Sequence, residues 1–462
     1  MLHVKTFLIR HPKTILFCLG CLSALAMAPV YAWPLMVIGY STLLYYLVKT
    51  THWKTASIYG FVFFFGYFLT SLYWISNSLF VELDRWWWAL PLSFAGLPFL
   101  LSLFPTFFIG IASYAPNLKA LAYILALIIA DLARSHLFTG FPWNLPVHTW
   151  AHNDLIMSSN LLPNFGLYGV NSLTIIALIL PYFTLVALRH KKTIGVISII
   201  LYTALFFYNG SIEIAEKQTN DHNIVMIQGN IAQKDKWDTN KIWDNFDRYI
   251  TMSKDAITTD EPHIIIWPET AISQYLIEMP RGHEMFSSFL SNLPQNSVLI
   301  TGILTHQNNN HFNSIHVYNT QGDILGSYDK HHLVPFGEYM PFGLETITGV
   351  SGFTSGNVPN HIYIKHANFS FLPLICYESL FPHYIPSTDN SRIILNLTND
   401  AWFGQTAGPY QHFDHMIFRA VETEKIAIRL SGNGISGYIN SNGQIQSVSA
   451  LNKQKTIFIK KK

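Results

Sequence analysis

The sequence predicts a polytopic α-helical membrane domain of about seven spans, followed by an α/β layered domain. The first observation is composition: half of the 462 residues are hydrophobic and 12% are charged, whereas soluble proteins carry about 25% charged residues. The second is that the charges are unevenly placed. Residues 1–210 are long apolar runs with few carboxylates, namely Glu82, Asp84, Asp131 and Asp154. From about residue 220 the charges return, and short apolar runs alternate with amphipathic stretches.

Composition also excludes several classes of protein. Intrinsic disorder is excluded because so much apolar surface must be buried. The 29 basic and 27 acidic residues give a net charge of +2, so the chain is not a general polyanion binder and no nucleic-acid partner is expected. Three cysteines are too few for a disulfide scaffold.

Seven apolar runs are candidate membrane spans, because crossing a bilayer core takes about 20 apolar residues. They cover residues 14–33, 35–48, 57–75, 88–112, 118–134, 164–188 and 194–209. The second and seventh are short but contain no charge. We therefore expect a membrane domain over residues 1–212, and a short polar linker at 210–221.

Basic residues in the loops predict the orientation. With the N-terminus in the cytoplasm, only Arg85 and Arg134 lie outside. The basic residues then inside are Lys5, Arg10, Lys13, Lys49, Lys54, Lys119, Arg189, Lys191 and Lys192. An odd number of spans places the second domain on the far side, which is the periplasm in a bacterium. A cleaved signal peptide ending near Ala26–Ala28 is the less favoured alternative, because further spans follow at once.

The second half of the chain is predicted to form alternating strands and helices. Buried strands are predicted at residues 223–229, 263–267, 297–303, 369–376 and 392–397, and helices at 240–257, 281–292 and 410–427. This alternation is typical of an α/β domain, expected over residues 220–455.

Three side chains that follow apolar runs have the chemistry of a nucleophilic site. Cys376 ends a predicted strand, where α/β folds place reactive groups, although buried free cysteines are common. Glu269 follows Pro268, which is expected to end its strand. Burial there would raise the pKa of Glu269 and suit a general base; a helix N-terminal acid is the alternative.

Lys330 is the third candidate, since an ammonium favours a thiolate and stabilises an oxyanion. Glu338, eight residues on, could orient that lysine or complete a pair of carboxylates. A solvated loop lysine is the alternative interpretation. Metal binding is not expected: His331 and His332, or His412 and His415, lack the usual paired spacing.

Glu, Lys and Cys in this order resemble the nitrilase, or carbon–nitrogen hydrolase, superfamily. With membrane spans in front, nearly the whole chain resembles the apolipoprotein N-acyltransferase family of Gram-negative bacteria. The matching segments are Trp267-Pro268-Glu269, Lys330 with 333–338 (LVPFGE), Cys376-Tyr377-Glu378, 399–404 (NDAWFG), 408–412 (GPYQH), 433–435 (NGI), 228–230 (QGN) with Trp237, and 139–143 (TGFPW). The LVPFGE and NDAWFG segments are specific, whereas the bare residue order is not.

The resemblance implies a nitrilase-like αββα sandwich and a role for each matching residue. Glu269 is the implied general base, Lys330 the oxyanion stabiliser and Cys376 the nucleophile. Residues that family members need for activity match Glu338, Tyr377 and Glu378. Tryptophans implicated in acyl-chain or substrate contact match Trp237 and Trp402, for which interfacial or packing roles are the alternative. No cofactor or metal is implied.

The implied reaction moves an acyl chain from a phospholipid, with phosphatidylethanolamine the expected donor, to the α-amino group of the N-terminal diacylglyceryl-cysteine of an apolipoprotein. A Cys376 thioester would make the kinetics ping-pong. The implied location is the bacterial inner membrane, with the lipid bilayer and diacylated apolipoproteins as partners. A membrane-tethered amidase and an inactive lipoprotein-binding membrane protein are the alternatives.

The sequence departs from the family pattern in two places. Family members usually end with one more membrane helix, but no apolar run of spanning length follows residue 410. The C-terminus is therefore expected in the periplasm. The residues after Phe141-Pro142-Trp143, NLPVHTW, also differ from the usual continuation.

Overall fold

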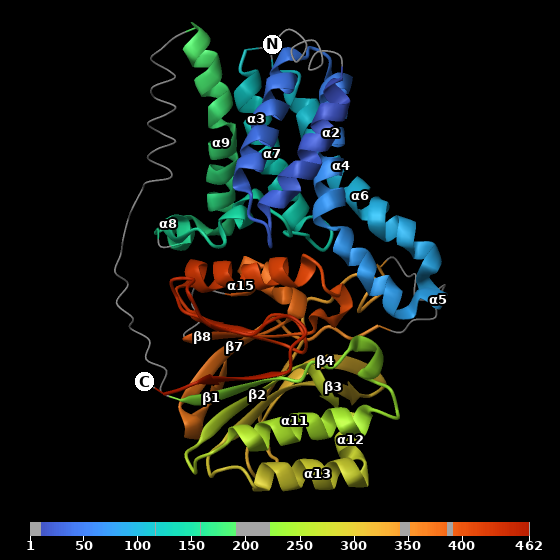
Figure 1. Cartoon of the computed structure of the whole chain (residues 1–462), viewed down its shortest axis with the longest axis vertical. Coiled ribbons are helices and arrows are strands. Elements are labelled where there is room, and N and C mark those ends of the chain that lie inside the picture. The colour runs from blue at the N-terminus through green and yellow to red at the C-terminus, as the bar shows by residue number, and fades with distance from the viewer. Residues whose placement is uncertain are drawn as a thin grey trace. The chain divides into compact units, whose positions relative to one another are not determined.

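The computed structural model describes residues 11–115, 117–157, 159–190, 222–341, 352–385 and 391–461. These residues form two compact units (Figure 1). The helical unit contains the described residues up to 190 and also Thr406–Asp414. The α/β unit contains those from 222 to Gln405 and from His415 onwards. The predicted linker at 210–221 lies outside the described residues.

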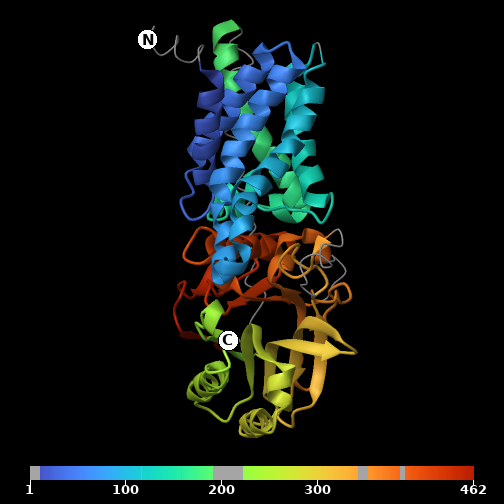
Figure 2. The ribbon, with the colours of Figure 1, turned by 90° about the vertical axis from the view of Figure 1, so that its right-hand side faces the viewer.

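The helical unit is a bundle whose long helices run side by side (Figure 1 and Figure 2). Its α-helices are α2 (Pro12–Ser23), α3 (Trp33–Lys49), α4 (Trp53–Ser71), α5 (Leu83–Trp86), α6 (Leu97–Ala112), α7 (Lys119–His136), α8 (Asp154–Met157) and α9 (Leu161–His190). Single-turn and irregular helices join them: η1 (Ala24–Ala26), η2 (Tyr73–Glu82), η3 (Trp87–Ala89), η4 (Leu92–Gly96) and η5 (Pro146–Trp150). Within α9, Gly166 has φ 65° and breaks the helix.

Each predicted span before residue 190 overlaps one or more helices, and the seventh, 194–209, lies outside the described residues. Two described helical segments, Leu92–Ala112 and Leu161–Thr184, are long and apolar enough to cross a membrane. A third candidate is the bent pair Trp53–Ser71 and Tyr73–Ala89, whose parts meet at 48°. The boundary predicted for the first span, 14–33, is wrong: α2 ends at Ser23, and Pro29, which has no amide hydrogen, lies in the loop that follows η1.

Two motifs that are far apart in the sequence meet in the helical unit. Trp143, from the TGFPW segment, donates its indole N–H to Gln411 Oε1 at 2.9 Å, and Trp74 donates to the same oxygen at 3.1 Å. Asp414 accepts bonds from Tyr31 at 3.0 Å and from His152 Nε2 at 3.2 Å. These bonds, of which the two to Gln411 are buried, explain why Thr406–Asp414 groups with the helices despite its position late in the chain.

The α/β unit begins with β1 (Asn223–Gln228), η6 (Gln233–Asp235), α11 (Ile242–Ala256), β2 (His263–Ser273), α12 (Gln274–Glu278), α13 (Pro280–Ser291), β3 (Val298–Gln307), β4 (Asn310–Tyr318) and β5 (Ile324–Asp329). It continues with β6 (Ile362–Ile364), η8 (Lys365–Ala367), β7 (Phe369–Ile375), η9 (Cys376–Leu380), η10 (Pro382–Tyr384), β8 (Ile393–Thr398) and η11 (Asp400–Phe403). Then come α15 (Gly408–Thr423), of which the residues from His415 onwards belong to this unit, β9 (Ile426–Ser431), β10 (Gly437–Ile439), β11 (Ile445–Val448) and β12 (Lys455–Ile459).

The strands form two mixed six-stranded sheets in the orders β12-β1-β2-β3-β4-β5 and β11-β10-β9-β8-β7-β6. Strands β1, β2 and β3 are parallel neighbours, as are β7, β8 and β9, and the outer strands pair antiparallel. Helices α11 and α13 lie on the outer side of the first sheet, and α15 lies along the outer side of the second (Figure 1). This layering agrees with the nitrilase-like sandwich that the resemblance implied.

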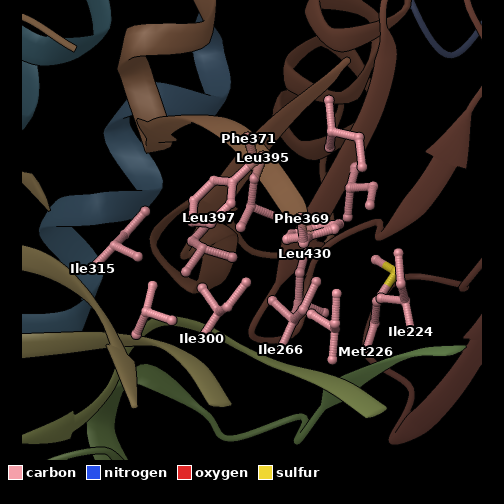
Figure 3. Packing of buried hydrophobic residues seen from close by; sticks show 14 of the residues in the cluster. Ile224, Met226, Ile266, Ile300, Ile315, Phe369, Phe371, Leu395, Leu397 and Leu430 are labelled. Atoms are coloured by element: carbon pink, nitrogen blue, oxygen red, sulfur yellow. The ribbon is translucent and has the colours of Figure 1, made fainter. Parts of the chain in front are cut away.

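Alternating side chains of the central strands build two cores. One set faces the space between the sheets: Ile224, Met226, Ile266 and Ile300 of the first sheet lie opposite Phe371, Leu395, Leu397 and Leu430 of the second (Figure 3). The intervening residues, such as Val225, Ile265 and Leu299, pack with α11 and α13. Strands buried on both faces are near-continuous apolar runs, which is why the sequence identified β1, β2, β3, β7 and β8. It did not identify β9, although all six residues of that strand are buried.

The structure corrects two predicted boundaries in this unit. The strand expected to stop at Pro268 continues to Ser273, because the proline lies in an interruption of the pairing rather than at its end. The helix predicted over 410–427 covers Gly408–Thr423, and β9 already begins at Ile426.

A buried ion pair holds the NDAWFG segment in place. Arg429 Nη2 lies 2.7 Å from Asp400 Oδ2, and both side chains are 0% exposed. Arg429 also donates to Asn396 Oδ1 at 2.7 Å. A side chain on Gly434 would place its Cβ 2.1 Å from the same Asp400 oxygen, so only glycine permits this approach.

We expect Arg429→Met to destabilise the protein by about 3–5 kcal/mol, because Asp400 would remain buried without its partner. The measurement is the thermal unfolding midpoint in detergent, with the exposed Lys455→Met as the charge-matched control. The double variant Arg429→Met with Asp400→Asn should recover part of the loss. An unchanged midpoint for the single variant would show that the pair does not hold the segment.

Candidate active site

A wide bulge in β2 carries Glu269. Trp267 pairs with Thr301 and Ile272 with Ile303, so the four residues 268–271 lie opposite the single residue Gly302. A Cβ on Gly302 would lie 2.4 Å from the Pro268 carbonyl oxygen and 2.5 Å from Glu269 Cα. Thr270 has φ 48°, a conformation that costs a β-branched residue of the order of 1–3 kcal/mol. Strain of this kind is common at functional sites.

Glu269 lies in a site that is almost dry. It is 5% exposed, and Oε1 accepts a 2.7 Å hydrogen bond from Asn313 Nδ2 on β4. Oε2 has no hydrogen-bond partner among the residues that the structure describes. Burial raises the pKa of Glu269, and the charge of Lys330 opposes this only in part. The predicted raised pKa is confirmed, and the free oxygen is available to receive a proton.

Lys330 lies directly after β5 and is buried, with 1% of its side chain exposed, so the alternative of a solvated loop lysine is wrong. Its Nζ lies 2.8 Å from Glu338 Oε1 and 2.7 Å from Oε2. Glu338 also accepts from Asn313 Nδ2 at 3.2 Å and from the Val334 amide at 2.8 Å. Glu338 therefore orients the lysine, and Asn313 links it to Glu269.

The charge of Lys330 is held by its neighbours. Burial opposes it, but Glu338, Cys376 and Glu269 outweigh that effect and keep the pKa of Lys330 above its usual value. The lysine is thus a permanent cation, as an oxyanion stabiliser must be.

Cys376 follows β7 and opens the turn η9, with φ 51°. Part of its surface is exposed, yet the surrounding protein removes enough water to raise the pKa of the thiol to about 12. Glu269 raises that pKa further, while Lys330 and a hydrogen bond with Thr398 lower it. The thiol is therefore protonated at neutral pH, and it needs a base to become a nucleophile.

Glu378 connects the lysine segment to the cysteine turn. It is 0% exposed. Its Oε1 accepts from Tyr328 Oη at 2.6 Å and from the amides of His331 and His332 at 2.9 and 3.0 Å. Its Oε2 accepts from the Ile375 amide at 2.7 Å. One carboxylate thus holds the residues next to both Lys330 and Cys376.

A second buried lysine, Lys236, touches the β2 bulge. It is 7% exposed, and its Nζ donates to the Glu269 carbonyl oxygen at 3.0 Å and to Thr270 Oγ1. Burial lowers the pKa of Lys236 to about 8, although Glu269 and Cys376 act in the opposite direction.

The predicted site residues are not all equally close to this centre. Glu269, Lys330 and Cys376 interact electrostatically with one another, and Glu338 joins them. The ring of Tyr377 packs against His332 and Phe381 instead. The tryptophans Trp237 and Trp402 are each 38% exposed, so their substrate contacts stay predictions, as do the catalytic roles.

Sequence reasoning missed Asn313 and Lys236. Asn313 lies on β4, in HFNSIHVY, whose alternating apolar and polar residues indicate a strand that was not predicted. Lys236 stands beside Trp237, which the motif did highlight. Nothing in the sequence distinguishes a buried lysine from a solvated one at that position.

Comparison with protein families matches both halves of the chain. Residues 19–180 match the model of the apolipoprotein N-acyltransferase N-terminal domain, and residues 224–459 match that of carbon-nitrogen hydrolases. Among solved structures, a carbon-nitrogen hydrolase from Helicobacter pylori G27 is 16% identical, with a TM-score of 0.38 over 51% of this chain and 87% of that one.

Curated relatives match over nearly the full length. The apolipoprotein N-acyltransferase of Rickettsia prowazekii is 32% identical, with 96% of this chain and 90% of the relative covered. That of Rickettsia bellii is 33% identical with the same coverage. That of Brucella suis biovar 1 is 34% identical over 85% of this chain and 77% of the relative.

Asn313→Ala should move the acid limb of Cys376 acylation to higher pH. The amide N–H lowers the pKa of Glu269 by favouring the carboxylate, so its loss raises that pKa and protonates the base at a higher pH. The measurement is the pH dependence of p-nitrophenolate release from p-nitrophenyl butyrate in the first turnover. Asn310→Ala, at the exposed start of β4, is the control. An acid limb that stays at the same pH, or that moves to lower pH, would contradict the role of Asn313.

Proposed function

Since this chain belongs to the apolipoprotein N-acyltransferase family and is therefore an acyltransferase that modifies apolipoproteins, we propose that Cys376 carries the acyl group between two half-reactions. The observation that supports this most is the arrangement of four side chains. A thiol on a strained turn, a carboxylate with a free oxygen and a lysine fixed by a second carboxylate are what acyl transfer through a thioester needs.

In the first half-reaction Glu269 Oε2 accepts the proton of Cys376. The thiolate attacks the sn-1 ester carbonyl of a phospholipid, for which phosphatidylethanolamine is the proposed donor. Lys330 and backbone N–H groups stabilise the oxyanion of the tetrahedral intermediate. Its collapse breaks the ester C–O bond, Glu269 returns the proton to the leaving oxygen, and a lysophospholipid departs from the thioester.

In the second half-reaction the α-amino group of a diacylglyceryl-cysteine attacks the thioester carbonyl. Glu269 takes a proton from the attacking nitrogen, the C–S bond breaks and the thiolate recovers a proton. The products are an amide at the apolipoprotein N-terminus and free enzyme. Because the lysophospholipid leaves before the second substrate reacts, the kinetics are ping-pong.

The protein is a membrane protein with candidate spans, and we assign the finer arrangement as follows. The helical unit crosses the bacterial inner membrane about seven times, since helices such as α3 and α7, with 17 and 18 residues, reach about 26 Å, close to the ~30 Å of a bilayer core. The N-terminus is cytoplasmic and the α/β unit periplasmic, as the basic loops favour.

The remaining predicted residues act around this centre in the proposal. Glu338 orients Lys330, and Glu378 fixes the segments next to Lys330 and Cys376. Tyr377 lies in the turn η9 that presents the thiol. Trp237 and Trp402 offer partly exposed rings as contacts for an acyl chain or substrate.

The test is to incubate purified protein in detergent with phospholipid radiolabelled in the sn-1 chain. We expect hydroxylamine-sensitive label on the Cys376 peptide, release of lysophospholipid and transfer of the label to an added diacylated lipopeptide. Cys376→Ser should abolish all three, whereas Cys18→Ser with Cys21→Ser should leave them intact.

Three results would overturn the proposal. Label retained by Cys376→Ser would place the acyl group elsewhere. Label that forms on Cys376 but passes only to water, whether or not lipopeptide is present, would identify a tethered hydrolase. Absence of any label or lysophospholipid would favour the inactive lipoprotein-binding alternative.

A further inference from the structure

The ammonium of Lys236 is bound differently from that of Lys330. Within the part of the chain that the structure describes, Lys330 forms an ion pair with Glu338, whereas both acceptors of Lys236 are uncharged, the Glu269 carbonyl and the Thr270 hydroxyl. The nearest acidic neighbour along the chain, Asp235, pairs with Lys241 instead at 2.7 Å. A buried cation held only by neutral oxygens is costly, so its presence calls for a reason.

The charges of the neighbouring side chains give a reason for the burial of Lys236. With Glu269 and Glu338 ionised and Lys330 charged, these three side chains together carry a net charge of −1, and the buried carboxyl group of Glu378 adds no positive charge. Transfer of the Cys376 proton to Glu269 leaves that total unchanged, because a thiolate replaces a carboxylate. Burying a net negative charge is expensive at every stage, and the ammonium of Lys236 reduces that charge throughout the reaction.

We propose that Lys236 is a positioning residue of this active site, which anchors the bulge that carries Glu269 and supplies the counter-charge for the Glu269 carboxylate and the Cys376 thiolate in turn. The inference rests on the proposed function for the identity of the nucleophile. It adds a residue that none of the matching motifs implied.

The titratable groups that face Lys236 give the inference a distinct pH signature. They are Glu269 on β2 and Cys376 in η9, and the pKa of Lys236 is lowered to about 8 by burial. Below that pH the ammonium favours the thiolate; above it the lysine is neutral and the advantage disappears. Lys330 keeps its charge across the same range, because its pKa is raised.

The experiment measures alkylation of Cys376 by iodoacetamide in the full-length protein in detergent, read by mass spectrometry of the Cys376 peptide. At pH 7 we expect Lys236→Met to slow alkylation about tenfold, equivalent to one pKa unit of the thiol. At pH 9.5 the wild-type alkylation rate divided by the Lys236→Met rate should fall towards one. Lys234→Met, which removes an exposed charge two residues away, should match the wild type at both pH values.

A second measurement needs no variant. In the wild-type protein the logarithm of the alkylation rate should rise with a slope below one around pH 8, because Lys236 loses its charge there. A slope of one throughout, or a Lys236→Met ratio that is the same at both pH values, would overturn the inference. Since no acyl donor is present, this outcome is independent of thioester labelling, which tests the proposed function itself.

Discussion

The buried ion pair between Lys330 and Glu338 is the constraint around which this site is organised. A lysine that is 1% exposed stays charged only if carboxylates surround it, and those carboxylates must in turn be held apart and oriented. Asn313 does this with one amide, whose Nδ2 donates to both Glu269 and Glu338. The protonation of Glu269 and the charge of Lys330 are therefore linked through the side chain of Asn313.

Positive φ angles recur in the segments that carry the reactive groups. Cys376 has φ 51°, Thr270 beside Glu269 has φ 48°, and Phe336 near Glu338 has φ 64°. Each costs of the order of 1–3 kcal/mol. The packing of the two sheets offsets this conformational cost, because their facing apolar side chains form one continuous buried core. The reactive segments extend from that rigid support, so their strained geometry persists.

Much of this architecture follows from patterns that burial imposes on sequence. Continuous apolar runs predicted β1, β3, β7 and β8, and the motifs identified Glu269, Lys330 and Cys376 as candidates. Strand β4, which lies between β3 and β5, carries mixed polar residues and was not predicted, and Asn313 was missed with it. Pro268 was misread as the end of a strand, because local propensity does not reveal that a neighbouring strand can accommodate a bulge. The burial of Lys236 was not predicted either, because it depends on contact with the same bulge.

The fit of the β2 bulge against Gly302 has a consequence for the interpretation of related sequences. The position of Glu269 depends on the missing side chain of Gly302, since a Cβ there would collide with the Pro268 carbonyl and the Glu269 backbone. A homologue could keep every reactive group and still be a pseudoenzyme if this one glycine were replaced. A comparison that counts only chemically active residues would class such a chain as functional, so the strand beside Glu269 should also be inspected before a function is assigned.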